Sequence, residues 1–598
     1  MRNQKYVALL AILLLSFIVS CKKKDFPITK ESPIEIDSIT SHYYEQYLKM
    51  YPLEATMQGD NRYNDLLPID IDKDFIDGEI AFYTDVQEQL KNIDYEGLSS
   101  DKKVIYDVLD TQLKDRVNRY AYHPEYIPFT QFSGLPLDFP MLGSGTGPQP
   151  FETEKDYENW LKRMNQFSNW MKTAEENFNE GIKAGIVLPK DLIVKMIPQM
   201  RANEITTSNL QDNIFFGPIK NMPNTFSKET KEKLTSAYSK MITESIIPAY
   251  LAMGDYLEKT YLPKGRDTDG YNSLPKGAEI YNYYVKSWTT TNKSPEEINE
   301  IGLKEVERIR GEMEIVKNDL GFTGSLEEFL TSLKSDPKAM PYDNAKDIIS
   351  DFNKILKVIE TKLKTMFNHI PKTGFEIRQT EKYREASASA EYRQGTADGK
   401  RPGIFYMPIP DPTKFNVTSG MESLFLHEAI PGHHYQISLQ QENESLPKFM
   451  RFGWIGAYGE GWALYTESLG PELGLYKDPY QKMGSLSDEM LRAVRLVIDT
   501  GLHTGKMTRE QAIDYFLQNV AYDEQGATAE VERYMAMPGQ ALSYKMGSMK
   551  IWELRNKYQK ELGEKFKLAD FHDEVLSQGC LPLTVLERKI GTWAKTVK

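Results

Sequence analysis

The residues best suited to chemistry in this chain form the run His427-Glu428-Ala429-Ile430-Pro431-Gly432-His433-His434, which holds three of its eight histidines. A histidine followed by a glutamate, with a second histidine about one helical turn later, can present two imidazoles to zinc and a carboxylate to nearby water. The spacing here is unusual, because Pro431 occupies the position four residues after His427. A metal site therefore requires the helix to be interrupted before the later histidines.

An unbroken helix fails with either later histidine. At about 100° and about 1.5 Å per residue, His433 would lie about 240° around the axis from His427, and His434 would lie about 10 Å along it. Zn–N bonds of about 2.0–2.1 Å cannot bridge such a gap. Pro431 cannot donate to the carbonyl of His427, and Gly432 tolerates unusual backbone angles, so we expect a bulge. A two-residue bulge makes His433 the second ligand and turns His434 toward substrate or a carboxylate, whereas a three-residue bulge selects His434.

Two carboxylates follow in the segment Tyr458-Gly459-Glu460-Gly461-Trp462-Ala463-Leu464-Tyr465-Thr466-Glu467. They are seven residues apart and share one face of a predicted helix. Their neighbours are apolar and aromatic, and a carboxylate buried there without a partner is costly. We expect Glu460 to be the third ligand. We expect Glu467 to orient a ligating histidine through its other ring nitrogen.

The elements that must position these residues are predicted to be mainly helical. Apolar residues recur every three or four positions in segments 74–98, 154–184, 228–257, 294–320 and 345–369. Ser294 and Thr508 each begin a helix-capping pattern. Ser419 and Glu422 have the capping-box spacing, so we expect the helix that carries His427 to begin at Ser419.

Two stretches break the helical pattern. Residues 131–151 are rich in Gly and Pro and predict a long loop. Residues 375–416 fit two short strands, at about 390–393 and 404–407, around a turn. A small β-sheet is thus expected directly before the metal-binding helix. Its edge strand could bind an extended peptide, or it could be a surface hairpin with no role in substrate binding.

Composition narrows the class of protein. A chain of 598 residues with 40% hydrophobic and 27% charged residues is typical of a globular protein with two or more lobes. The net charge of −13 and the lack of a basic stripe argue against nucleic acid as a partner.

The N-terminus has the features of a targeting segment. Arg2 and Lys5 precede an apolar run, residues 6–19, that is too short to span a membrane stably. Ile18-Val19-Ser20-Cys21 resembles the bacterial lipobox, which implies cleavage before Cys21 and lipidation of its thiol. The alternative is an ordinary secretory peptide with a chance cysteine. We therefore expect a lipoprotein signal peptide at 1–20 and a tether at 21–33. Through the lipid at Cys21 the protein would be anchored in the bacterial cell envelope, on its periplasmic or surface side.

Several motifs together resemble the domain of unknown function family 885, within the gluzincin-like zinc metallopeptidases. A more distant likeness is to angiotensin-converting-enzyme-type peptidases. This chain differs from them in having two additional residues between the histidines of the first motif. The resemblance covers nearly all of the mature chain, and its matching segments are residues 51–59, 427–434, 460–467, 495–503 and 532–547.

The resemblance implies a large, mainly α, two-lobed zincin-like fold with a small β-sheet near the active-site helix. We expect residues 34–370 to form a helical N-terminal lobe and residues 371–598 the zinc-binding catalytic lobe. Zinc (Zn²⁺) is expected on His427, His433 and Glu460, with Glu428 as general base and Tyr534 as donor to the transition state. Further candidates for supporting the site or contacting substrate are His434, Glu467, Arg533, Tyr544, Asp499 and His503. Tyr544 could instead serve packing alone, and Asp499 and His503, four residues apart, could simply pair with each other.

The leading expectation for function is zinc-dependent hydrolysis of short peptides, of carboxypeptidase or dipeptidase type. The alternative is a non-catalytic lipoprotein that binds oligosaccharide or peptide for a transporter. A third reading is a metal-dependent hydrolase of a non-peptide amide.

Overall fold

The computed structural model describes residues 35–380, 390–396, 399 and 401–598. The predicted signal peptide, the tether and Cys21 lie outside the described residues. Within them, no helix combines the length and the apolar character needed to cross a membrane.

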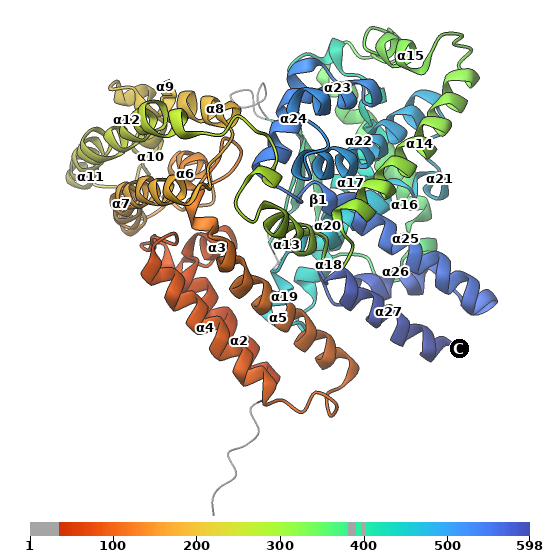
Figure 1. The fold of residues 1–598 in the computed structure, drawn as a ribbon, viewed down its shortest axis with the longest axis horizontal. Helices are drawn as coiled ribbons and strands as arrows, with labels where there is room; N and C mark the ends of the chain where they lie inside the picture. The colour runs from red at the N-terminus through yellow and green to blue at the C-terminus, as the bar shows by residue number, and fades with distance from the viewer. Residues whose placement is uncertain (1–34, 381–389, 397–398, 400) are drawn as a thin grey trace, which may run out of the picture.

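The fold is mainly α with one small sheet, as predicted (Figure 1). The helices of the N-terminal part are α2 (Ile36–Met50), α3 (Pro52–Met57), α4 (Lys73–Lys91), α5 (Ser100–Asn118), α6 (Leu135–Gly143), α7 (Glu154–Ala184), α8 (Lys190–Met200), α9 (Asn203–Thr206), α10 (Gly217–Lys220), α11 (Lys228–Met241), α12 (Ile247–Tyr256), α13 (Gly277–Thr289), α14 (Pro295–Asp319), α15 (Leu326–Leu333) and α16 (Ala345–Met366). Those that follow the sheet are α17 (Met421–Glu428), α18 (His433–Glu442), α19 (Lys448–Arg451), α20 (Gly456–Glu467), α21 (Gly470–Leu473), α22 (Pro479–His503), α23 (Arg509–Asn519), α24 (Glu524–Ala536), α25 (Leu542–Leu562), α26 (Leu568–Leu576) and α27 (Leu583–Val597).

The sheet has three strands, β1 (Phe375–Gln379), β2 (Glu391–Arg393) and β3 (Gly403–Met407), in the order β1-β3-β2. The two predicted strands are β2 and β3, which pair antiparallel with Tyr392 opposite Phe405. The prediction of only two strands is wrong, because β1 pairs parallel with β3, from Phe375 opposite Gly403 onward. Parallel neighbours are not joined by a tight turn, so β1 leaves no hairpin signal in the sequence.

Two further local predictions are wrong. The helix α17 begins at Met421 after Gly420, whereas Ser419 lies in a preceding 3₁₀ turn. The Glu422 carboxylate accepts the backbone N–H of Tyr476 at 2.7 Å, so a tertiary partner replaces the capping box. The predicted loop 131–151 contains α6, which is held because Phe139 stacks between Trp160 and Phe167 in the core.

Two large hydrophobic cores hold the molecule together. The first joins α7, α8 and α12 to α14 and to α22–α24, and the second joins α2, α4 and α5 to α16–α20 and α25–α27. In Figure 1 the group α6–α12 lies to one side, and α13 and α14 lie among the later helices. Each core combines segments from before and after residue 370, so N-terminal helices help to hold the C-terminal ones. The lobe boundary stays a prediction.

Candidate metal centre

The helix that begins at Met421 is interrupted between the histidines. It ends at Glu428, where Ala429 leaves the helical region (φ −108°, ψ −106°), and a new helix starts with His433. The Ile430–Pro431 peptide bond is cis. A Cβ at Gly432 would lie 1.9 Å from the carbonyl oxygen of His427, so only glycine fits there. The interruption is therefore a complete break into α17 and α18, larger than the predicted two-residue bulge.

The break brings two imidazoles to one carboxylate. The Nε2 atoms of His427 and His433 each lie 3.5 Å from Glu460 Oε2. One donor atom from each of the three residues lies within 4.8 Å of the others. Glu460 comes from α20, which packs across α17 and α18. Two imidazole nitrogens and one carboxylate oxygen are a donor set that fits catalytic zinc, whose fourth ligand is water or substrate.

His427 is held at both ring nitrogens. Its Nδ1 lies 2.7 Å from Glu467 Oε1, one of the contacts expected from the sequence. Burial alone would lower the pKa of His427, but the hydrogen bonds to Glu460 and Glu467 outweigh it and raise the pKa to about 10. Burial likewise opposes ionisation of Glu460, yet its contacts with the two histidines hold the pKa of this carboxyl well below its ordinary value.

Glu428 lies half-buried beside the cluster and faces the sheet. Its Oε2 accepts the backbone N–H of Tyr392 at 3.0 Å. Tyr392 belongs to β2, an edge strand of the sheet, so this N–H is free of the ladder and can hold the carboxylate.

His434 points away from Glu460. Its ring packs against Phe375 of β1 at 4.8 Å between centroids, and its Nδ1 lies 3.0 Å from the hydroxyl of Tyr392. Burial lowers the pKa of His434 to about 4. We expected it to turn toward substrate or a carboxylate, but its partner here is a tyrosine hydroxyl.

The predicted transition-state donor lies in a second polar cluster. The Tyr534 hydroxyl donates to Glu530 Oε2 at 2.6 Å and accepts from Arg495 Nε at 3.3 Å. Arg533 donates to the hydroxyl of Tyr544 at 3.3 Å, and the guanidinium of Arg495 lies 4.6 Å from the centre of the Tyr544 ring. Tyr534, Arg533 and Tyr544 are thus gathered around Arg495 and Glu530.

Asp499 and His503 have separate partners. Asp499 accepts from the Tyr281 hydroxyl at 2.6 Å and from the Gly539 N–H at 3.0 Å. His503 accepts the N–H of Tyr271 at 3.2 Å, and its Nε2 donates to the carbonyl of Tyr534 at 3.0 Å. Burial raises the pKa of Asp499 to about 7 and lowers that of His503 to about 3. His503 therefore stays neutral and holds the backbone of Tyr534.

One face of α22 links the two clusters, and three of its residues, Asp488, Arg492 and Arg495, were not among the predicted site residues. Arg492 lies 3.7 Å from Glu467 Oε1 and 3.1 Å from Asp488, which accepts from the Ser423 hydroxyl. Arg495, one turn further on, reaches Glu530 at 2.9 Å. The polar positions 488, 492 and 495 continue the three-to-four spacing of Asp499 and His503, and this stripe through an apolar helix is the signal that could have found them.

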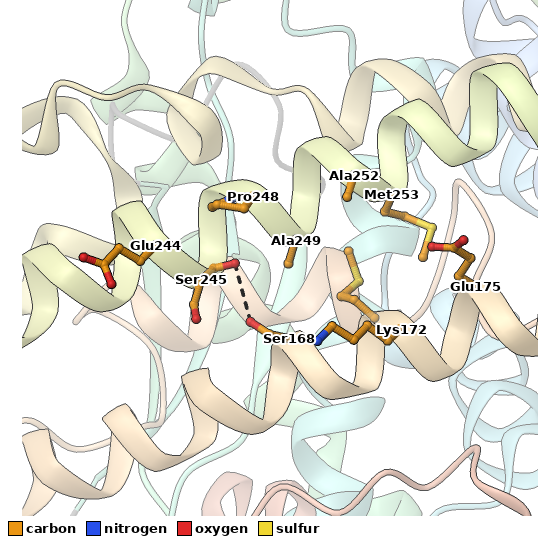
Figure 2. Close-up of a pocket in the computed structure, with 10 residues that line it drawn as sticks. Ser168, Lys172, Glu175, Glu244, Ser245, Pro248, Ala249, Ala252 and Met253 are labelled. Atoms are coloured by element: carbon orange, nitrogen blue, oxygen red, sulfur yellow. Dashed lines mark hydrogen bonds between the residues drawn. The ribbon is translucent and has the colours of Figure 1, made fainter.

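A large cleft of about 1270 Å³ lies between α5, α13 and the segment that enters α20. Trp454 lines this cleft, and its ring lies 5.6 Å from that of His433. Nothing in the local sequence marks Trp454 as a site residue. Figure 2 shows a separate pocket of about 280 Å³ between α7 and α12, with Lys172, Glu175 and Glu244 at its edge. Its lining holds no histidine or cysteine, so it offers no comparable metal ligands.

Fold and site together define a mainly α protein with a candidate metal centre of two histidines and one glutamate. The chain belongs to the family described as "Bacterial protein of unknown function (DUF885)", whose pattern matches residues 52–590. The predicted family is thereby confirmed, whereas the relation to gluzincins and angiotensin-converting-enzyme-type peptidases stays a prediction. No curated protein matches the chain.

Solved structures resemble the whole chain. One, titled "putative lipoprotein", is from Colwellia psychrerythraea, with 29% identity, a TM-score of 0.86 and coverage of 94% of this chain and 98% of that one. Another, a "putative lipoprotein of unknown function" from Shewanella oneidensis, has 18% identity, a TM-score of 0.72 and coverage of 93% and 99%. A carboxypeptidase from Pyrococcus furiosus matches with 10% identity, a TM-score of 0.41 and coverage of 94% and 99%. The Shewanella structure shows a similar fold and no more. The TM-score of the Pyrococcus structure is too low to show a common fold.

Proposed function

We propose that the protein is a zinc-dependent hydrolase of short peptides. The observation that carries the proposal is that His427 Nε2 and His433 Nε2 each lie 3.5 Å from Glu460 Oε2, with Glu428 next in sequence to one ligand. Two histidines, a carboxylate and an adjacent glutamate form the set that zinc hydrolysis requires.

Each residue near the centre has a proposed task. Zinc, when bound to His427, His433 and Glu460, supplies a Lewis acid that activates water and polarises the scissile carbonyl. Glu428 takes the proton of the attacking water and delivers it to the leaving amine. The Tyr392 N–H, 3.0 Å from Glu428 Oε2, keeps this carboxylate in place.

Orientation of the ligands is assigned to the residues behind them. Glu467 accepts from His427 Nδ1, which leaves Nε2 free for the metal. Arg492 balances the charge of Glu467. Tyr534 is the proposed donor to the oxyanion of the substrate, and for that its hydroxyl must exchange Glu530 for substrate.

We also propose that the protein is a lipoprotein of the bacterial cell envelope. The similar solved structure from Colwellia psychrerythraea is described as a "putative lipoprotein", and residues 18–21 have the lipobox pattern. The lipid on Cys21 is the proposed anchor.

The test combines metal analysis with a peptide digest. Protein purified without added zinc should contain about one equivalent by mass spectrometry of the metal, and it should cleave a library of short peptides. Glu428→Gln keeps the side-chain shape but removes the proton acceptor, so turnover should collapse while zinc stays bound. Tyr534→Phe should lower kcat by about 10²–10³-fold.

Two outcomes would overturn the proposal. The first is a zinc-loaded protein that cleaves no peptide. If such a protein still bound peptide or oligosaccharide stoichiometrically, the binding-protein alternative would take its place. The second is a Glu428→Gln variant that hydrolyses peptides at the wild-type rate, which would remove Glu428 from the mechanism.

A further inference from the structure

Trp454 connects the large cleft to the metal centre, because it lines the cleft and contacts His433. Its walls come from α5 on one side, from α13 on the other, and from residues 454–456, which lead into α20. At about 1270 Å³ it exceeds the range of about 300–1,000 Å³ typical of small-molecule pockets, so it can hold several linked residues of an extended chain.

Trp454 forms the end of the cleft next to the metal centre. Its side chain is 47% exposed, unusual for so large an aromatic residue. The indole makes a T-shaped contact with the ring of His433, with 5.6 Å between ring centroids and 60° between ring planes. The ring also covers Gly459, where a Cβ would lie 2.1 Å from Trp454 Cη2. Trp454 is therefore held in place by α18 and α20 while the rest of its surface faces the cleft.

The lining near Trp454 is aromatic, and the charges further along are mostly paired. Trp288 lines the same cleft and lies near Gly456, two residues after Trp454. Along α5, Asp110 pairs with Lys114 at 2.6 Å. A group that packs on Trp454 thus meets an apolar surface rather than a free charge.

We propose that this cleft binds the substrate peptide and that Trp454 selects an apolar side chain in the residue next to the scissile bond. The inference rests on the proposed peptide hydrolysis and names its substrate class: short peptides with an aromatic or aliphatic residue at that position. The reason is proximity, because a side chain stacked on Trp454 lies one ring away from a ligand of the metal. Flat aromatic surfaces bind such side chains with little loss of conformational entropy.

The test uses peptides that differ only in the residue next to the cleaved bond, with Phe, Leu or Gly at that position. Trp454→Ala should lower kcat/KM about tenfold for Phe and Leu and less than about twofold for Gly, so that the wild-type preference disappears. Trp454→Phe retains a ring and should lose about two- to threefold. Zinc content and thermal unfolding of each variant show whether the site and the fold persist. Leu303→Ala on α14, also 47% exposed but outside the cleft, is the matched control and should keep the preference.

A binding measurement separates this inference from the proposed function. Fluorescein-labelled peptides of the same series are titrated against Glu428→Gln protein with and without Trp454→Ala, with anisotropy as the readout. If the wild-type protein cleaves nothing, the proposed hydrolysis fails. The role of Trp454 would still be supported if Trp454→Ala weakened the binding of the Phe peptide and left that of the Gly peptide unchanged. An unchanged ratio of Phe to Gly affinities, or of the corresponding kcat/KM values, would overturn the inference. So would a loss for Trp454→Phe on the Phe peptide as large as that for Trp454→Ala.

Discussion

His427 shows how much of the centre depends on single contacts. Its Nε2 faces Glu460 and its Nδ1 meets Glu467, so the ring has one orientation and one nitrogen left for a metal. His433 shares Glu460 at the same distance of 3.5 Å. The neighbouring His434 is bound to a tyrosine hydroxyl on the other side of α18. Two adjacent histidines therefore differ completely in what they can coordinate.

This difference predicts opposite results for the two histidines. His433→Ala should abolish stoichiometric zinc because one of three ligands is lost. His434→Ala should keep zinc, since its Nδ1 bonds Tyr392, although lost packing against Phe375 should lower thermal stability. Metal analysis of both variants after dialysis decides the matter. If His434→Ala lost zinc and His433→Ala retained it, the ligand assignment would be reversed.

At the scale of elements, α20 is the piece that completes the centre. It carries both Glu460 and Glu467, and it crosses α25 where Gly461 meets Gly547. A Cβ on Gly461 would lie 2.5 Å from the Gly547 Cα, so two glycines allow a backbone approach that any larger residue would prevent. The position of Glu460 relative to α17 and α18 depends on that approach.

Substitution at the crossing should therefore disturb the centre from a distance. A Cβ at Gly547 would lie 1.8 Å from the carbonyl oxygen of Ala457, so Gly547→Ala must push α25 from α20. We expect a loss of about 1–3 kcal/mol or more in the free energy of unfolding, with weaker zinc binding. Urea unfolding and zinc titration measure the two effects.

The control is a glycine on an open helix surface. Gly311 in α14 has nothing within 4 Å of a built Cβ, so Gly311→Ala should be neutral or stabilise by up to about 1 kcal/mol. Equal stability of Gly547→Ala and Gly311→Ala would show that the crossing tolerates separation.

Another buried histidine joins elements and makes their packing sensitive to acid. His572 of α26 donates from Nδ1 to the carbonyl of Met366 at 2.9 Å, and its Nε2 accepts from the Tyr465 hydroxyl at 2.7 Å. Burial lowers the pKa of His572 to about 3. The folded protein thus holds His572 neutral, while the unfolded chain takes up a proton below about 6.5.

The sign of the pH effect follows. Because the unfolded state binds the extra proton, the contribution of His572 to stability is present above about pH 6.5 and is lost as pH falls toward about 3, by about 1.4 kcal/mol per pH unit. His572→Gln should be less stable at pH 7 but should lose less stability between pH 6 and pH 4. Urea unfolding of metal-free wild type and variant gives both slopes. Parallel slopes would mean that His572 is protonated in the folded state.

At the scale of the whole molecule, the two cores explain how a long chain builds one site. The second core packs α2, α4 and α5 against α17–α20, so the N-terminal helices support the centre they do not contribute to. The first core joins α7 and α12 to α22 and α24, which hold Arg495 and Tyr534. In Figure 1, α2, α4, α7 and α12 lie to the left of the C-terminal helices. Neither half is expected to hold the metal centre on its own.

The anchor of the whole molecule gives a further prediction. Cys21→Ser should leave the precursor uncleaved or release the protein from membranes, because the lipobox pattern of residues 18–21 needs the thiol. Fractionation of cells that express the variant and wild type measures this partition. A Cys21→Ser protein that is processed normally and stays with membranes would refute lipidation there.

Much of the fold was readable because its signals are local. Apolar spacing predicted the long helices, including α7 and α16, at nearly their observed bounds, and the capping patterns at Ser294 and Thr508 are present. The predicted ligands His427, His433 and Glu460 also lie together. Their prediction was possible because Pro431 and Gly432 indicate the helix break that this geometry needs. A side chain's type, its spacing along a helix and a helix breaker all act within a few residues of each other.

The remaining features depend on partners far along the chain. The Tyr476 N–H donates to the Glu422 carboxylate, so Glu422 does not cap α17. Trp160 and Phe167 stack with Phe139 and stabilise α6 in a segment rich in Gly and Pro. Tyr392 binds His434, and only the meeting of the loop before α20 with α18 puts Trp454 against His433. Such contacts stabilise the fold only after distant segments have packed and the entropy of loop closure has been lost. No local pattern of residues therefore encodes them.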